Sequence, residues 1–142
     1  MTKRVRRRGR AVNIVLTVIG VVIIVLLGAL AFTEGERREG RNLPIGEVDF
    51  ATISDGTYHG TYEGGRYKWR ANEVDVTVAN GRVVDIDIAT AANKPAATVT
   101  ETLFERVVQA QSLQVDTVSS ATITSKSFLK SIENALRTAA GK

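Results

Sequence analysis

The sequence predicts an α+β fold, in which a small antiparallel sheet packs with two helices and is preceded by one N-terminal transmembrane helix. Three observations predict it: an uncharged apolar run over residues 11–32, two alternating segments around Asn80-Gly81, and two later segments with helical apolar spacing. The chain has 142 residues. This length allows one ordinary domain beside the apolar run.

Composition excludes several kinds of site. The chain has no Cys and a single His, His59. It therefore has no disulfide framework, thiolate metal site, iron–sulfur cluster, c-type haem or multi-His metal site. Residues 1–10 hold six basic residues and no acid, so the net charge of +4 becomes −2 for the rest of the chain. We therefore expect no nucleic-acid partner.

Residues 11–32 have the length and apolarity of a membrane span. As a helix they would extend ~33 Å, enough for a hydrocarbon core of roughly 30 Å. The basic tail, residues 1–10, predicts a cytoplasmic N-terminus and an extracytoplasmic C-terminal part in the cell membrane. A cleaved signal peptide is the alternative, because Ala29-Leu30-Ala31 fits a cleavage site, but its apolar region is usually only about 7–15 residues long. Both interpretations place the C-terminal part outside the cytoplasm.

The segment 33–48 is rich in charge and contains Gly and Pro, so we expect a solvated linker. A domain over residues 49–142 follows. Turns at Asp55-Gly56 and Gly64-Gly65 flank a short strand, Thr57–Glu63.

The strongest local pattern is a hairpin. Residues 73–78 and 84–88 alternate between apolar and polar, and Asn80-Gly81 between them predicts a type I′ turn. The acidic residues of the polar face could suggest a metal site, but alternation already explains them as a solvated strand face. They are Asp75, Asp85 and Asp87.

Two helices follow the loop 89–97. Thr98 and Glu101 have the spacing of a capping box, which would open a helix to about Gln111. Its expected apolar stripe is Val99, Leu103, Val107 and Ala110. From Ser125 helical spacing resumes, and Gly141 fits a stop. This second stripe is Phe128, Leu129, Ile132, Ala135, Leu136 and Ala139.

The segment 116–126 is rich in hydroxyl side chains and runs into the last helix. A helix N-terminus offers free N–H groups and the positive end of the helix dipole, which suit a phosphate, and Lys126 would add charge. The alternative is that Thr124 or Ser125 only caps the helix. The residues alone favour the capping reading, because caps are the commonest use of Ser and Thr at such a position.

This segment resembles the signature of the FMN-binding domain family, Asp-x-x-Ser/Thr-Gly-Ala-Thr. The matching positions are Asp116, Ser119, Ser120, Ala121 and Thr122, followed by Ile123-Thr124-Ser125-Lys126. The Asp55-Gly56 turn and the hairpin also resemble the family's layout, so the resemblance covers about residues 53–139. The family includes the covalent flavin subunits of the sodium-pumping NADH:quinone reductase and of the Rnf electron-transport complex.

The resemblance implies that FMN is joined through its phosphate to the Thr122 hydroxyl by a separate flavin transferase that uses FAD and Mg²⁺. A Thr hydroxyl is a weak nucleophile, and no His lies nearby in sequence, so we expect no self-flavinylation. Thr124 and Ser125 would hold the remaining phosphate charge. Asp116 matches the position for transferase recognition, although it could equally form an Asx-type turn.

Ser120 departs from the family, which most often has Gly there. Gly permits positive φ and close backbone approach, so Ser120 fits if the loop backbone is ordinary at that position. Aromatic side chains near Gly64-Gly65 could stack on a flavin, but we favour ordinary packing for them. They are Tyr62, Tyr67 and Trp69.

The expected function is that of a membrane-anchored, extracytoplasmic flavoprotein that transfers electrons between redox partners in the membrane or outside it. A carrier fits one domain better than a stand-alone catalyst does. Two alternatives remain: a terminal reductase module, and a cofactor-free interaction domain that keeps the fold.

Overall fold

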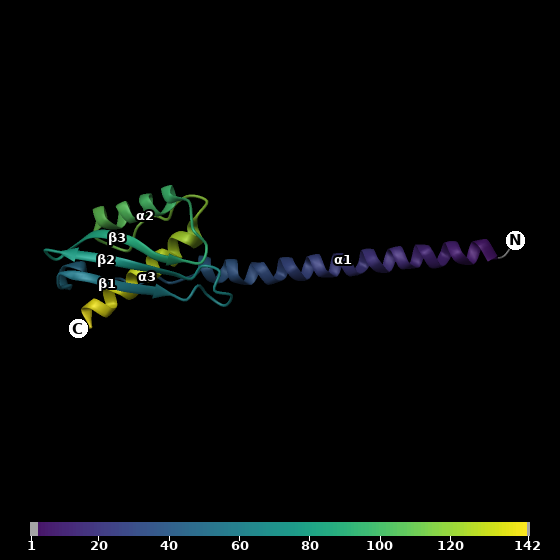
Figure 1. The fold of residues 1–142 in the computed structure, drawn as a ribbon, viewed down its shortest axis with the longest axis horizontal. Helices are drawn as coiled ribbons and strands as arrows, with labels where there is room; N and C mark the ends of the chain where they lie inside the picture. The colour runs from purple at the N-terminus through teal and green to yellow at the C-terminus, as the bar shows by residue number, and fades with distance from the viewer. Residues whose placement is uncertain (1–2, 142) are drawn as a thin grey trace. The chain divides into compact units, whose positions relative to one another are not determined.

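The computed structural model describes the backbone of residues 3–141 and the side chains of residues 12–35 and 37–141. The chain divides into two compact units at Gly35/Glu36. Its elements are α1 (Lys3–Arg41), a 3-10 turn (Phe50–Thr52), β1 (Gly56–Tyr62), β2 (Asn72–Ala79), β3 (Arg82–Ala91), α2 (Ala97–Ala110) and α3 (Thr122–Ala140) (Figure 1). This arrangement confirms the α+β prediction.

The first unit, residues 1–35, contains the apolar part of α1. The stretch from Val12 to Arg41 is long and apolar enough to cross a membrane, with a mean hydropathy of 3.1 in its most apolar window. Its large apolar side chains are exposed from Val12 to Phe32. A helix that is apolar on all sides and covered by no protein suits a lipid environment.

The segment expected to be a linker is more ordered than its composition suggests. α1 continues to Arg41, through the first nine residues of that segment. Farther on, Ile45 and Val48 pack on the core of the second unit. The segment therefore contributes to the folded domain as well as connecting to it.

The sheet has the order β1-β2-β3 with antiparallel pairing throughout. Asn80 and Gly81 have φ values of 54° and 68°, as a type I′ turn requires. On β2 the alternation holds, and Val74, Val76 and Val78 are buried.

β3 departs from the predicted alternation. The pairing slips between Thr77 and Val78, so that Val83 opposes Val78 while Asp85 opposes Thr77. Val84 is the extra residue of this bulge, and its side chain is 49% exposed although the pattern placed it inside. Val83 takes its place in the core.

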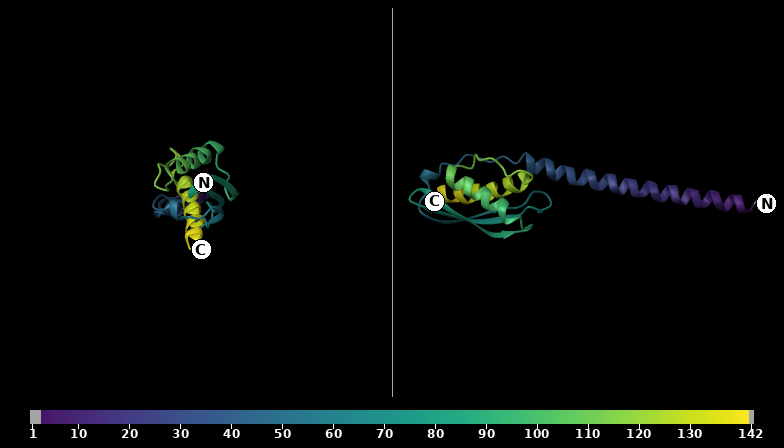
Figure 2. Two further views of the ribbon diagram at one scale, coloured as in Figure 1. Left: turned by 90° about the vertical axis from the view of Figure 1, so that its left-hand side faces the viewer. Right: turned by 90° about the horizontal axis from the view of Figure 1, so that it is seen from above.

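Both α2 and α3 cover the same face of the sheet (Figure 2). All six residues of the apolar stripe expected for the last helix are buried. α3 approaches β1 closely at Gly60, where an added Cβ would collide with the Ser131 carbonyl. Because α3 is buried along most of its length, the position of its first turn relative to the sheet is fixed.

The predicted N-terminal capping box of α2 is wrong, and so is the reading in which Thr124 or Ser125 caps the start of α3, whereas Gly141 ends α3 as expected. α2 begins at Ala97 after Ala96, which makes no side-chain cap bond, so Thr98 lies in the first turn and cannot form a capping box. α3 begins at Thr122, three residues before Ser125, and its N-cap residue Ala121 has no side chain that could cap it. The apolar period does not show this early start, because the additional turn holds two threonines and a single apolar residue, Ile123.

Candidate functional site

The hydroxyl-rich loop before α3 closes on itself through Ser125. The Val118 N–H donates to the Ser125 hydroxyl at 3.1 Å, and the Ala121 N–H donates to the Val118 carbonyl at 3.0 Å. Ser125 is fully buried. Its hydroxyl therefore shapes the loop from inside and does not cap the helix, which corrects one of the two readings of this segment.

Ser120 lies in the left-handed region, with φ of 64°. The condition under which Ser120 would fit, an ordinary loop backbone, is therefore not met. The left-handed conformation costs a residue with a Cβ roughly 1–2 kcal/mol, and Gly avoids this cost. The loop has the shape that a glycine would adopt, and Ser120 adopts it under strain. Ser119 and Ser120 are both exposed.

Thr122 is the first residue of α3 and is exposed. The Ser125 N–H donates to the Ala121 carbonyl at 2.8 Å. The three preceding N–H groups, of residues 122–124, lie in the first turn, where the helix supplies no carbonyl to accept them. The Thr122 hydroxyl is thus accessible and stands at the positive end of a 19-residue helix.

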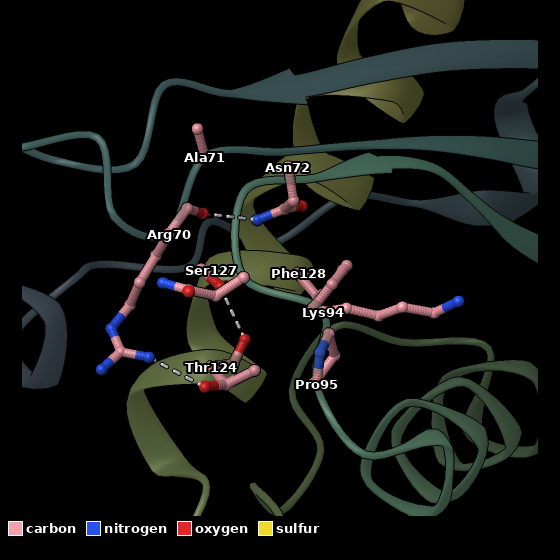
Figure 3. A pocket seen from close by; sticks show the side chains of 9 residues that line it. Arg70, Ala71, Asn72, Lys94, Pro95, Thr124, Ser127 and Phe128 are labelled. Atoms are coloured by element: carbon pink, nitrogen blue, oxygen red, sulfur yellow. Dashed lines mark hydrogen bonds between the residues drawn. The ribbon is translucent and has the colours of Figure 1, made fainter.

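The structure adds a cation that the sequence did not reveal. The Arg70 guanidinium donates from Nη1 to the Thr124 hydroxyl at 2.9 Å, across the mouth of a small pocket (Figure 3). Arg70 stands just before β2, 54 residues from Thr124. Nothing in the sequence distinguishes it from the other basic residues of the chain, so only the fold identifies it.

The pocket beside Arg70 has a volume of about 70 Å³. Its lining includes Arg70, Asn72, Lys94, Thr124, Ser127 and Phe128. Lys94 extends away from Arg70 in Figure 3. Arg70 is therefore the cation that reaches the first turn of α3.

The backbone of Arg70 is held in place by a buried amide. Asn72 is 3% exposed and donates from Nδ2 to the Arg70 carbonyl at 2.9 Å. Its Oδ1 accepts the Ser131 hydroxyl at 2.6 Å. Arg70 is thus connected to α3 through both its backbone and its side chain, and the site is organised before any ligand arrives.

Asp116 opens the loop and is exposed. Arg106 of α2 donates to the carbonyls of Asp116 and Thr117 at 2.7 and 3.2 Å. No residue that the structure describes donates a hydrogen bond to the Asp116 carboxylate, which is therefore open to a partner. Recognition of Asp116 by a transferase stays a prediction.

Lys126 acts away from Thr122. Its Nζ donates to the carbonyls of Arg41 and Leu43, at 2.6 and 3.5 Å. Its charge therefore serves the C-terminal end of α1, where a cation is favourable. Lys126 is therefore engaged elsewhere, and Arg70 is the cation that contacts Thr124.

The aromatic residues near Gly64-Gly65 lie at the surface or close to it. Tyr67 and Trp69 form a tilted ring pair, with centroids 5.7 Å apart. Trp69 is 46% exposed, and its carbonyl accepts the Asn93 amide at 2.6 Å. Tyr62 is half-buried on β1. Whether these rings contact a flavin stays untested.

His59, on the opposite face of the sheet, has partners that the sequence did not suggest. Its Nδ1 lies 2.8 Å from Asp75, and its Nε2 lies 3.4 Å from Glu73. The hydrogen bond to Asp75 raises the pKa of His59, with Glu73 adding to the effect. Within the described residues, no three His, Asp or Glu side chains form a group that could hold a metal ion.

The sequence of this region matches a known protein family. The sequence model of a family described as FMN-binding domain matches residues 68–137. No match to a curated protein is found. The matched range contains Arg70, the whole hydroxyl-rich loop and most of α3.

Proposed function

Residues 68–137 belong to the FMN-binding domain family, and we propose that this chain carries FMN as a phosphoester on Thr122 and serves as an electron-transfer flavoprotein. The observation that carries the proposal is the first turn of α3. There the exposed Thr122 hydroxyl lies at the N-terminal end of a long helix. The Arg70 guanidinium donates a hydrogen bond to the Thr124 hydroxyl in the same turn.

The site fits a phosphate diester, which keeps one negative charge after attachment. The free N–H groups of residues 122–124 and the helix dipole stabilise that charge. Arg70 adds a full positive charge and can donate to a phosphate oxygen as well as to Thr124. FMN on this chain would supply one- and two-electron redox chemistry.

Attachment requires a partner. In the proposed transfer, a bond forms between Thr122 Oγ and the FMN phosphorus of FAD, the pyrophosphate bond breaks, and AMP leaves. The hydroxyl proton needs a base, and His59, the chain's single His, lies on the opposite face of the sheet, paired with Asp75. A flavin transferase with Mg²⁺ would supply both base and metal.

Placement at the membrane is part of the same proposal. The apolar length of α1 and the basic residues before it support a single-pass anchor, with the N-terminus in the cytoplasm and the domain outside. Such an anchor would keep the flavin near membrane redox partners and raise its effective concentration there. Protease protection of tags placed at each end tests this orientation in sealed right-side-out vesicles. A protease-accessible N-terminal tag would refute it.

The decisive experiment concerns Thr122. The full chain is produced with and without a flavin transferase, and flavin fluorescence is measured on denaturing gels together with intact mass. We expect fluorescence that survives denaturation only with the transferase, that vanishes in Thr122→Ala, and that persists in Thr124→Ala. Flavin that is released by denaturation would refute the covalent bond and keep the binding function.

A cofactor-free interaction domain is the second candidate, and the strain at Ser120 favours it. If the wild-type chain acquires no flavin with the transferase while Ser120→Gly does, the loop keeps the family's backbone shape but Ser120 prevents flavin attachment. Absence of flavin from both proteins would leave the interaction domain as the better account.

A further inference from the structure

The free edge of β3 offers a surface that the flavin site does not use. β3 pairs with β2 on one side only, and no other strand in the described part of the chain covers its second side. A groove of about 330 Å³ runs between this edge and α2. Among the described residues of the second unit, the exposed large apolar side chains are Trp69, Val84 and Ile88, and two of these three lie on β3.

The backbone of Val83, at one end of this edge, is already hydrogen-bonded to a side chain in the way that a neighbouring strand would bond it. The Gln111 side chain accepts the Val83 N–H at 2.9 Å and donates to the Val83 carbonyl at 2.8 Å. Both backbone groups of Val83 therefore face away from β2. The Gln111 amide closes this end of the edge, and the bulge at Val84 adjoins it.

The remaining part of the edge is open. Val83, Ile86 and Ile88 oppose Val78, Val76 and Val74, which are alternate residues of β2. In an antiparallel ladder alternate residues direct their N–H and C=O to the same side, so Ile86 and Ile88 present theirs outward as Val83 does. A second register shift lies between Glu73 and Val74, where Ala89 is the extra residue and Thr90 opposes Glu73. An extended segment could therefore add hydrogen bonds along residues 86–88.

The chemistry around the edge selects the occupant. Phe104 and Val108 of α2 give the groove an apolar wall, while Glu101 and Glu105 add acidic groups. Asp85 and Asp87 stand on the other face of β3 and are exposed. A strand placed here would direct alternate side chains toward the apolar wall and toward these carboxylates.

We propose that β3 docks an extended segment of a partner protein in which apolar residues alternate with lysine or arginine, added as a fourth strand beside residues 86–88. Backbone pairing and the apolar wall provide affinity, and the carboxylates select basic side chains. A second copy of this chain fits less well, because two β3 edges would bring Asp85 and Asp87 of both copies together.

The probe is a seven-residue peptide of alternating lysine and valine, capped at both ends and labelled for fluorescence anisotropy. It is titrated onto the full chain in a neutral detergent at low salt, and amide shifts are followed by NMR. Two control peptides are used: one with the same residues grouped by type, and one with glutamate in place of lysine. We expect binding of the alternating basic peptide only, with amide shifts concentrated at residues 86–88 and on α2.

Variants separate pairing from charge. Ile88→Pro removes an outward N–H without touching the β2 ladder and should abolish binding, whereas Ile88→Val should keep it. Asp85→Asn combined with Glu105→Gln should weaken binding about tenfold, since exposed ion pairs contribute modestly. Glu63→Gln combined with Glu47→Gln removes two exposed charges outside the groove and should have no effect.

Several results would overturn the proposal. They are equal binding of the grouped peptide, unchanged binding by Ile88→Pro, and amide shifts on the outer sheet face in place of the edge. Edge shifts that depend on protein concentration without peptide would assign the surface to a second copy. Because no step requires flavin, these results are independent of the outcome at Thr122.

Discussion

The two helices of the domain lie on one face of the sheet but are packed very differently. α3 buries ten of its 19 residues against β1 and β2, whereas α2 buries three of its 14 residues. The candidate attachment residue stands on α3, and the open groove lies along α2. The proposed attachment site thus lies on the helix with more buried residues, where its geometry is fixed in advance, and the proposed docking surface lies along the less buried helix.

The largest expected difference concerns two phenylalanines that touch. Phe104 of α2 and Phe128 of α3 make an edge-to-face contact with centroids 5.8 Å apart, but Phe128 is 1% exposed and Phe104 only partly buried. Phe128→Ala should lower the free energy of unfolding by roughly 3–5 kcal/mol. Phe104→Ala should cost less, about 1–2 kcal/mol.

Urea unfolding of the full chain in neutral detergent, followed by fluorescence of the single Trp69, measures both variants. Equal losses would show that α2 and α3 are equally well packed, which would remove the basis of the comparison.

A buried carboxylate gives the next effect. Glu133 of α3 is 3% exposed and accepts hydrogen bonds from Lys130, the Gly46 N–H and Arg137, at 2.9, 2.9 and 2.7 Å. Burial raises the pKa of Glu133, but these three donors outweigh it and leave the pKa below its ordinary value. Glu133→Gln should cost roughly 1–3 kcal/mol at neutral pH, since it weakens all three contacts.

The sign of the pH dependence follows from the lowered pKa. The stabilisation by Glu133 is present above its ordinary value of 4.5 and is lost as the pH falls through the lowered value in the folded state. The difference between wild type and Glu133→Gln should therefore shrink in acid. The matched variant Glu101→Gln, at an exposed position of α2, should change stability little at any pH, and an equal effect there would contradict the assignment.

Two neighbouring serines test the strain in the loop before α3. Ser120→Gly should raise the free energy of unfolding by about 0.5–1 kcal/mol, because Ser120 has φ of 64°. Ser119→Gly should lower it by a similar or smaller amount, because Ser119 does not have positive φ. Thermal or urea unfolding of both variants checks the opposite signs, and the same sign for both would refute strain at Ser120.

The smallest effect belongs to the sheet face that neither helix covers. The raised pKa of His59 means that its pairing with Asp75 stabilises the fold fully below pH 6.5, and that this contribution is lost as the pH rises through the raised value. His59→Gln should therefore be less stable than wild type at pH 6 and equal to it at pH 9. Melting temperatures across this range test it, and a constant difference would contradict it.

Some features follow from local sequence because they repeat over short distances. The apolar run of α1, the Asn80-Gly81 turn and the buried stripe of α3 each depend on a period or a turn residue that neighbours in the chain define. The resemblance of the 116–126 segment to the FMN-binding domain family was equally local, and the family match over residues 68–137 confirms it.

The tertiary structure alone decided the rest, because it depends on contacts between residues far apart in the chain. Arg70 meets Thr124 across 54 residues, and Gln111 meets the edge of β3 across 28. The bulge at Val84 and the left-handed Ser120 arise where strand pairing and the packing of α3 fix the backbone, and no local pattern encodes either. The sequence thus determined the family resemblance and the position of the hydroxyl-rich loop, and the fold determined that Arg70 lies beside Thr124 and that one edge of β3 stays open.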